Sequence, residues 1–139
     1  MSGGKVFVDT NILVYAHDTS SGSKGLKARE ILLDLWESRR GVLSTQVLQE
    51  FYIVVTRKIP KPLEPGRARD IVESLLHWDV VVNDPEAVLE AIDLSEKHGL
   101  SFWDALVVQA AVVAGAEVLL SEDLNPGQVI EGVRVENPF

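Results

Sequence analysis

Near its amino terminus the chain reads Lys5-Val6-Phe7-Val8-Asp9-Thr10-Asn11, a short apolar run followed by three polar residues. An apolar run of this length with two β-branched residues is typical of a strand buried on both faces of a parallel sheet. Asp9 would then lie at the carboxyl end of the strand, where open α/β sheets bind their ligands. Because aspartate is also a favoured helix N-cap, Asp9 alone does not indicate a chemical role.

Strand-like and helix-like segments alternate along the rest of the sequence. Short apolar runs predict further strands at 42–44, 80–82, 118–121 and 133–135, the last as an edge strand. Helical spacing of apolar residues predicts helices at 12–16, 24–37, 46–58, 67–77, 85–98 and 105–114. This alternation predicts a three-layer α/β/α domain with a central, mainly parallel sheet of about five strands, covered on both faces by helices.

Several predicted helix ends carry capping signals. Asp84, followed by proline, is a good helix start, and Gly99 is a good stop for the same helix. Thr45 is placed to cap the helix that follows the second strand. Ser101 with Asp104 three residues later resembles a capping box in which aspartate replaces the usual glutamate or glutamine.

The bulk composition is that of a single globular domain. The chain has 139 residues, of which 46% are hydrophobic and 24% charged, which are ordinary values for a domain with a sizeable core. No apolar run reaches membrane-spanning length and the first residues lack the layout of a signal peptide, so we expect a cytoplasmic protein without membrane contact. The absence of cysteine excludes disulfides and thiolate chemistry, and the three histidines have no metal-ligand spacing.

Charge is distributed unevenly along the sequence. The formal net charge of −8 argues against indiscriminate binding of nucleic acid. Residues 1–69 hold 11 basic and 7 acidic residues, a balance of +4, whereas residues 70–139 hold 2 basic and 14 acidic residues, a balance of −12. The proline-rich segment 57–67 is either a solvated linker or a contact surface for phosphates or an acidic partner. Its basic residues are Arg57, Lys58, Lys61 and Arg67.

Two acids are expected near Asp9 because of their place in the predicted topology. Asp123 follows the predicted strand 118–121, and the carboxyl ends of parallel strands share one rim of the sheet. Asp104 begins a helix that is apolar nearly all round and must therefore be buried. Asp104 thus places a carboxylate at the amino-terminal end of a buried helix. The alternative is that Asp104 has only a structural role, in the capping box with Ser101.

Glu50 is expected on the apolar side of its helix. Val47 and Val54 lie three and four residues away, and Phe51 adjoins it. A carboxylate in that position must be paired, neutralised or bound to a metal, because burial of an unpaired charge is costly. The structural alternative is a salt bridge to an arginine.

Convergence of these acids on Asp9 would have a chemical consequence. Four carboxylates around one crevice repel one another unless a cation lies between them. Ligands that are all oxygen favour a hard divalent ion, so the sequence predicts a site for Mg²⁺ or Mn²⁺.

Four segments of the chain together resemble the PIN-domain nucleases, and among them the single-domain VapC-type toxins of prokaryotic toxin–antitoxin pairs. The segments are Val6–Tyr15, Leu43–Phe51, Ser101–Ala105 and Leu119–Leu124. They occur in the family's order and at its separations, and they extend over nearly the whole chain. The resemblance therefore implies a single PIN-like nuclease domain over residues 1–139, with a Rossmann-like sheet.

The resemblance also implies roles for individual residues. The family's catalytic and metal-binding acids fall on four positions, Asp9, Glu50, Asp104 and Asp123. Glu122 is a rival for the fourth position, which the spacing assigns to Asp123. Supporting positions fall on Asn11, beside the first acid, and on Ser121, where threonine is more usual. The hydroxyls of Thr10 and Ser44 are expected to orient groups rather than to attack.

The activity that the resemblance implies is a metal-dependent endoribonuclease, the toxin of a type II toxin–antitoxin pair. One or two ions would activate a water for in-line attack on the RNA phosphodiester, so no side-chain nucleophile is needed. The implied partners are a second copy of the chain, RNA, and a small antitoxin whose tail covers the active site. The basic residues of segment 57–67 would contact RNA or the antitoxin.

Two other classes of function are compatible with acids at strand ends. A receiver-type phospho-accepting signalling domain also binds magnesium on a doubly wound α/β fold. The receiver pattern has a pair of acids after the first strand, whereas here Asp9 is followed by Thr10 and Asn11. The other alternative is a PIN-like domain that binds its partner without catalysis.

Overall fold

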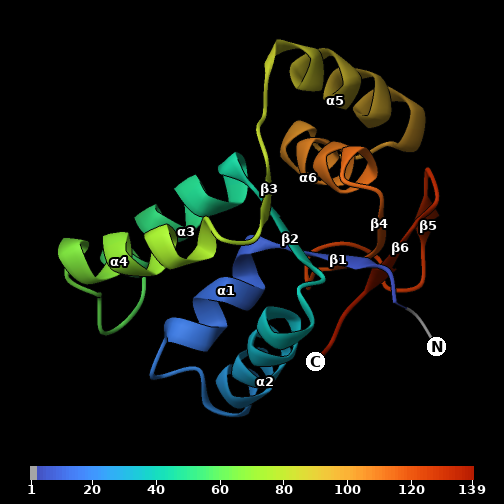
Figure 1. Cartoon of the computed structure of the whole chain (residues 1–139). Helices are drawn as coiled ribbons and strands as arrows, with labels where there is room; N and C mark the ends of the chain where they lie inside the picture. The colour runs from blue at the N-terminus through green and yellow to red at the C-terminus, as the bar shows by residue number, and fades with distance from the viewer. Residues whose placement is uncertain (1–2) are drawn as a thin grey trace.

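The structure of the chain, a computed structural model, describes residues 3–139 (Figure 1). The strands are β1 (Lys5–Val8), β2 (Gly41–Ser44), β3 (Asp79–Val81), β4 (Ala116–Leu120), β5 (Val129–Ile130) and β6 (Val133–Glu136). The helices are α1 (Thr10–His17), α2 (Gly22–Ser38), α3 (Thr45–Arg57), α4 (Pro65–Leu75), α5 (Pro85–His98) and α6 (Phe102–Val113). In residues 3–139 none of the helices has both the length and the hydropathy that a bilayer crossing requires.

The strands form one sheet in the order β3-β2-β1-β4-β6-β5. Neighbouring strands pair in parallel, except that β5 is antiparallel to β6. The mainly parallel sheet is therefore confirmed. Its order reverses direction between β1 and β4, the strands that precede Asp9 and Ser121. In open α/β sheets this switch point is where ligands bind.

The end of the chain corrects two predictions, the strand number and the position of segment 133–135. The sheet has six strands, and β6 lies inside it between β4 and the edge strand β5. The hairpin of β5 and β6 closes through Glu131 and Gly132, whose φ angles are 49° and 86°. Two-residue hairpin turns require such positive φ values, but glutamate is not among the residues that favour them. The turn therefore carried no clear signal in the sequence.

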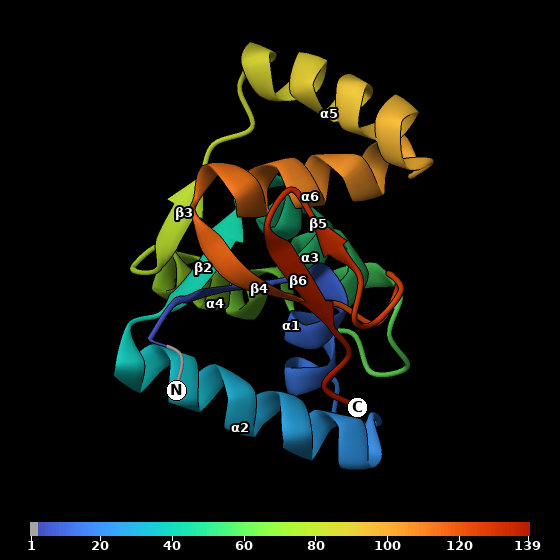
Figure 2. The same ribbon diagram turned by 90° about the vertical axis from the view of Figure 1, so that its right-hand side faces the viewer.

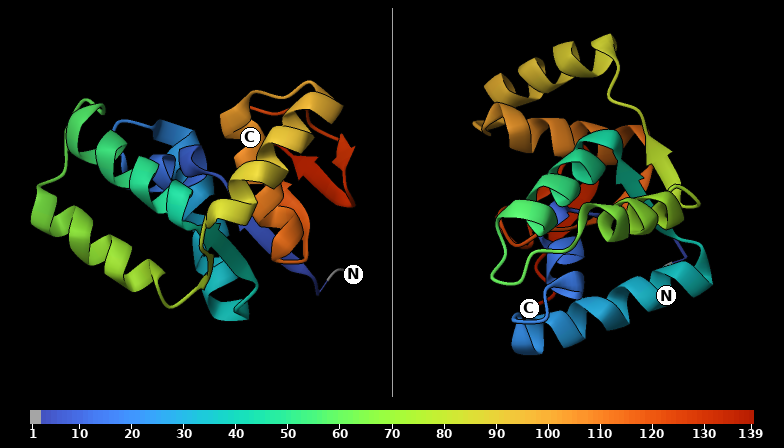
Figure 3. Two further views of the ribbon diagram at one scale, coloured as in Figure 1. Left: turned by 90° about the horizontal axis from the view of Figure 1, so that it is seen from above. Right: turned by 90° about the vertical axis from the view of Figure 1, so that its left-hand side faces the viewer.

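Helices cover both faces of the sheet. α6 packs on one face with α5 outside it, while α1 and α2 lie on the opposite side (Figures 1 and 2). α3 and α4 lie side by side and, seen from above, extend away from α5 and α6 (Figure 3). This arrangement confirms the predicted three-layer α/β/α architecture.

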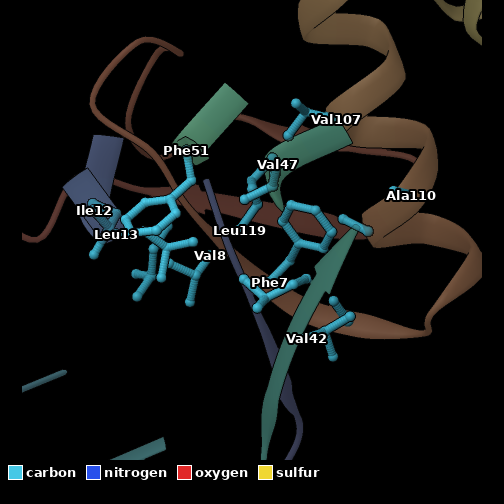
Figure 4. Packing of buried hydrophobic residues seen from close by; sticks show 14 of the residues in the cluster. Phe7, Val8, Ile12, Leu13, Val42, Val47, Phe51, Val107, Ala110 and Leu119 are labelled. Carbon is cyan, nitrogen blue, oxygen red and sulfur yellow. The ribbon is translucent and has the colours of Figure 1, made fainter. Parts of the chain in front are cut away.

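The central strand β1 is buried on both faces, as predicted. Phe7 and Val8 are fully buried although consecutive strand residues point to opposite sides of a sheet. Figure 4 shows Phe7 on the side of Ala110 of α6 and Val8 beside Leu13 of α1. Packing on both faces fixes the position of the strand end that carries Asp9.

Most predicted helix ends are confirmed. Asp84 caps α5, Gly99 ends it, and Ser101 caps α6. The cap of α3 is a correction, because Ser44 and not Thr45 occupies that position. The Ser44 hydroxyl accepts a hydrogen bond from a first-turn backbone N–H over 3.2 Å. Ser44 keeps the extended backbone of β2 (φ −130°, ψ 163°) that a capping residue needs, whereas Thr45 is already helical.

Candidate active site

Asp9 is a buried acid at the end of β1 and the N-cap of α1. Its Oδ1 accepts a hydrogen bond from the backbone N–H of Thr10 over 2.7 Å. Its Oδ2 accepts one from the buried hydroxyl of Ser121, also over 2.7 Å. Burial raises the pKa of Asp9 to about 6, although both hydrogen bonds act to lower it. The nearby charges of Asp123 and Glu50 raise this pKa further, so three acids share one electrostatic neighbourhood.

Asp123 is exposed in the turn that follows β4. Its backbone N–H donates to the Ser121 hydroxyl over 3.1 Å, and its Oδ2 accepts from Nδ2 of Asn11 over 3.1 Å. Ser121 therefore links Asp123 to Asp9, and Asn11 links it to α1. The two strands on either side of the switch point are joined through these contacts.

Glu122 belongs to a different cluster. The Tyr15 hydroxyl donates to one of its carboxylate oxygens and the Lys24 ammonium donates to the other. Lys24 and then Tyr15 hold the pKa of Glu122 below its ordinary value. The contact with Asn11 is thus made by Asp123 and not by its neighbour Glu122.

The predicted burial of Glu50 is wrong. Glu50 is exposed, and the buried stripe of α3 runs through Val47, Phe51 and Val55. Successive helix residues are rotated by about 100°, so Glu50 lies beside this stripe rather than within it. In the part of the chain that the structure describes, Glu50 also forms no ion pair with an arginine or a lysine.

Polar partners hold Glu50 at the rim of the sheet. Nε2 of Gln46, one turn earlier on α3, donates to its Oε1 over 2.8 Å, and the Thr10 hydroxyl donates to its Oε2 over 3.4 Å. The same Gln46 nitrogen lies 3.3 Å from the carbonyl oxygen of Trp103 in α6. The sequence analysis missed Gln46. Its spacing of four residues from Glu50 on one helix face is the signal that could have found it.

Asp104 is half-buried in the first turn of α6. Within residues 3–139 its carboxylate forms no hydrogen bond or ion pair, and it is not among the charges that shift the pKa of Asp9. The structure therefore places Asp104 at the border of the cluster, one residue after Trp103. The acids that it brings together are Asp9, Glu50 and Asp123.

The remaining predicted positions lie around the cluster rather than in it. Ser44 is buried, and its hydroxyl caps α3. The basic segment 57–67 connects α3 to α4, and Arg57 lies roughly 10 Å along the helix axis from Glu50. Segment 57–67 therefore forms a surface beside the acid cluster and is not part of it. Its exposed basic residues are Arg57, Lys58, Lys61 and Arg67.

The cluster offers a hard cation the right kind of atoms. Oδ1 of Asn11 and Oε1 of Gln46 are buried oxygen acceptors without a hydrogen-bond partner among the described residues. The three carboxylates are oxygen donors as well, and oxygen ligands suit Mg²⁺ or Mn²⁺. Among residues 3–139 no three acidic or histidine side chains are close enough to hold an ion between them.

Comparison with known proteins identifies the family. The sequence model of the PIN domain matches residues 6–129, so the chain belongs to the PIN domain family. Among curated proteins, none matches this sequence.

Solved structures with this fold include toxins and toxin–antitoxin complexes. Mycobacterium tuberculosis VapC20, described as a sarcin-ricin loop cleaving toxin, is 19% identical with a TM-score of 0.65, over 86% of this chain and 92% of that one. A toxin–antitoxin complex from Klebsiella pneumoniae is 18% identical with a TM-score of 0.71, over 97% and 98% of the chains. DNA-bound VapBC from Salmonella typhimurium is 20% identical with a TM-score of 0.67, over 98% and 99%. At these identities the likeness establishes the fold.

Strand order excludes the receiver alternative. The parallel strands of this sheet run β3-β2-β1-β4-β6, which is the order of a Rossmann half-fold extended by two strands. Receiver domains have the flavodoxin-like order 2-1-3-4-5, in which the first strand has the second and third as neighbours. Here β1 lies between β2 and β4 instead.

Proposed function

We propose that this protein is a metal-dependent endoribonuclease and the toxin of a type II toxin–antitoxin pair. The observation that carries the proposal is the buried Asp9 at the switch point of the sheet, with Glu50 and Asp123 beside it. Membership of the PIN domain family supports a nuclease. The shared fold with VapC20, a sarcin-ricin loop cleaving toxin, supports RNA as the substrate.

The proposed ligands of Mg²⁺ or Mn²⁺ are the carboxylates of Asp9, Glu50 and Asp123, with Asp104 completing the set. Asn11 adds its unpartnered amide oxygen. When bound, such an ion supplies Lewis-acid activation of a water and neutralises charge on the phosphate. No nucleophilic side chain is required for hydrolysis of this kind.

The residues around the acids position them. The Ser121 hydroxyl holds Asp9 Oδ2 and the backbone of Asp123, which keeps two carboxylates at a fixed separation. Gln46 and Thr10 hold the two oxygens of Glu50. Preorganisation of this kind would keep the carboxylate oxygens in place to bind the metal ion.

The proposed partners follow from the structures that share the fold. One is a toxin–antitoxin complex and another is VapBC bound to DNA. We therefore propose that a small antitoxin silences the chain. From its resemblance to the VapC-type toxins we also propose that residues 1–139 act as one nuclease domain and that the chain forms homodimers. The exposed bases at the connection of α3 and α4 are the proposed contacts with RNA or antitoxin.

The test is cleavage of RNA by the purified chain in Mn²⁺, in Mg²⁺ and in excess EDTA. We expect cleavage only with the metals, and a loss of about 100-fold or more in Asp9→Asn and Asp123→Asn. Asp70→Asn, at an exposed position of α4, serves as the control and should cleave normally. Cleavage in EDTA, or normal cleavage by Asp9→Asn, would contradict the proposal. Binding of Mn²⁺ and RNA without cleavage would instead favour a non-catalytic PIN-like binding domain.

A further inference from the structure

We propose that Asn83, which follows the edge strand β3, is a positioning residue for Glu50. Through Gln46 it fixes the place from which the Glu50 carboxylate binds the metal ion. This inference rests on the proposed function, in which Glu50 is one of the metal ligands. Asn83 is not one of the acids, and it acts through hydrogen bonds that join the end of β3 to the first turns of α3.

Strand pairing brings Asn83 to the start of α3. β2 and β3 pair in parallel, with Ser44 opposite Val81, and the carboxyl ends of parallel strands share one rim of the sheet. β2 continues directly into α3, whose first residue is Thr45. β3 continues into the connection to α5 (Figure 1), which contains Asn83. Asn83 is therefore a neighbour of Thr45 although 38 positions separate them.

Three hydrogen bonds join Asn83 to the first turn of α3. Its Oδ1 accepts from the backbone N–H of Gln46 and from the hydroxyl of Thr45, each over 2.9 Å. Its own backbone N–H donates to the Thr45 hydroxyl over 3.1 Å. The N–H of Gln46 can only donate, so the Asn83 amide must turn its oxygen and not its nitrogen toward α3. The first N–H groups of a helix have no partner within the helix, so Asn83 caps α3 from the end of another strand.

Gln46 connects the capped end of α3 to the acid cluster. Its side chain is buried. Its Nε2 donates to Oε1 of Glu50 over 2.8 Å and lies 3.3 Å from the carbonyl oxygen of Trp103. Asn83 thus holds the backbone of Gln46, while two acceptors hold its side-chain nitrogen. Gln46 cannot move far without losing one of these bonds, and an unmade hydrogen bond at a buried group is costly.

The position of Glu50 depends mainly on Gln46. Glu50 is exposed, and within residues 3–139 it forms no ion pair. Its two hydrogen bonds are unequal, because the bond from Thr10 is 3.4 Å long and the bond from Gln46 is 2.8 Å long. Bonds from a hydroxyl to an oxygen are ordinarily about 2.7 Å long. Loss of Asn83 should therefore displace Glu50 by way of Gln46.

Asp84 provides a matched control, because it is also a capping residue and adjoins Asn83. Its Oδ1 accepts a hydrogen bond from the backbone N–H of Ala87, in the first turn of α5, over 2.9 Å. The side chain of Asp84 thus caps α5, whereas that of Asn83 caps α3. Substitution of either residue by alanine removes a helix cap, which lowers stability. Only Asn83→Ala also removes a partner of Gln46.

The first experiment compares the metal-free full chains by NMR in EDTA. In Asn83→Ala we expect the side-chain amide resonances of Gln46 and the carboxyl resonance of Glu50 to shift, and in Asp84→Ala both should stay in place. A second pair of variants tests the same contact from α3. Thr45→Val removes the hydroxyl that Asn83 binds and should shift both resonances, whereas Thr45→Ser keeps the hydroxyl and should not. If Asn83→Ala does not fold, this pair decides.

The second experiment measures Mn²⁺ affinity by calorimetry. We expect Asn83→Ala to weaken binding roughly tenfold, as for other residues that hold metal ligands in place, and Asp84→Ala to bind normally. In a Glu50→Gln background, Asn83→Ala should change the affinity by no more than about twofold. The reason is that the ligand positioned by Asn83 is already lost, and residues that act through one another are not additive.

Unchanged resonances of Gln46 and Glu50 in Asn83→Ala would overturn the inference, and so would normal Mn²⁺ affinity in that variant. A loss of the same size in the Glu50→Gln background would also overturn it, because Asn83 would then act on another ligand. A wild-type chain that binds no Mn²⁺ would contradict the proposed function instead. The resonances of the metal-free proteins would still decide whether Asn83 positions Glu50.

Discussion

The Ser121 hydroxyl donates a hydrogen bond to Oδ2 of Asp9 over 2.7 Å across the switch point of the sheet. The same hydroxyl accepts a hydrogen bond from the backbone N–H of Asp123 over 3.1 Å. One buried oxygen therefore fixes the positions of two of the proposed metal ligands, and it lowers the pKa of the first of them.

Loss of this hydroxyl is expected to weaken the metal site. In Ser121→Ala the carboxylate of Asp9 loses a partner and the N–H of Asp123 loses its acceptor. We expect the affinity for Mn²⁺, measured by calorimetry, to fall roughly tenfold, as for other residues that hold metal ligands. Ser121→Thr keeps the oxygen and should bind Mn²⁺ nearly as well as the wild type. Equal affinity in the alanine and wild-type proteins would show that the hydroxyl does not position the ligands.

The raised pKa of Asp9 predicts how stability depends on pH in EDTA. Since the folded value is about 6 and the ordinary value 3.8, the folded state holds an extra proton between these limits. Protonation of Asp9 therefore contributes to the free energy of unfolding. This contribution is complete below pH 3.8 and is lost as pH rises through 6, a decrease of up to about 3 kcal/mol. Asp9→Asn should therefore be more stable than the wild type at pH 8, with a difference that shrinks at pH 4.

Urea denaturation in EDTA at the two pH values measures this difference, and addition of Mn²⁺ provides the control. The metal should stabilise the wild type at pH 8 and should stabilise Asp9→Asn much less, because ligand binding to the folded state raises its stability. A wild-type protein that is more stable than Asp9→Asn at pH 8 in EDTA would mean that burial does not penalise the charged form of Asp9.

Local patterns explain how much of the fold could be predicted. Consecutive apolar residues in a strand, such as Phe7 and Val8, are expected where helices cover both faces of the sheet. The structure has that strand, β1, inside the sheet with both residues buried. Asp84 and Gly99 likewise act through neighbouring backbone atoms alone. The hairpin through Glu131 could not be predicted, because the residue adopts a positive φ that its side chain does not favour.

The site was harder to predict because it depends on tertiary contacts. Asp9 and Asp123 are 114 positions apart, and they meet because β1 pairs with β4. The alternation of strands and helices indicates a common rim but not which strands are neighbours. The predicted burial of Glu50 was wrong because a step of one residue along a helix turns the side chain by about 100°. The role of Gln46 as a link between α3 and α6 depends on the packing of those helices, which no local pattern specifies.

The cluster around Glu122 predicts a change in its titration. Lys24 and then Tyr15 hold the pKa of Glu122 below its ordinary value. In Lys24→Met we expect this pKa to rise, and in Tyr15→Phe to rise less, as read from carboxyl shifts in an NMR titration. Because Glu122 precedes Asp123, a looser turn should also slow RNA cleavage a few-fold. Arg69→Met, which removes an exposed pair with Glu73 on α4, should change neither quantity.

Two glycines, Gly41 in β2 and Gly66 in α4, predict opposite effects of a single added methyl group. A Cβ at Gly41, the first residue of β2, would lie 2.4 Å from two carbons of the Trp78 ring. Gly41→Ala must therefore displace a packed indole or the strand, and we expect a loss of about 1–3 kcal/mol in the free energy of unfolding. A Cβ at Gly66, in the first turn of α4, would have no atom within 4 Å. Gly66→Ala should therefore gain about 0.5–1 kcal/mol, because alanine loses less backbone entropy in a helix.

Urea denaturation of the two variants beside the wild type measures both changes. Gly41 is at the opposite end of β2 from Ser44, so the stability of Gly41→Ala should fall while the folded fraction still binds Mn²⁺ with normal affinity. Equal stability of Gly41→Ala and the wild type would show that the Trp78 ring moves aside without cost. A loss of Mn²⁺ affinity in the folded fraction would show instead that strain at one end of β2 reaches the acids at the other.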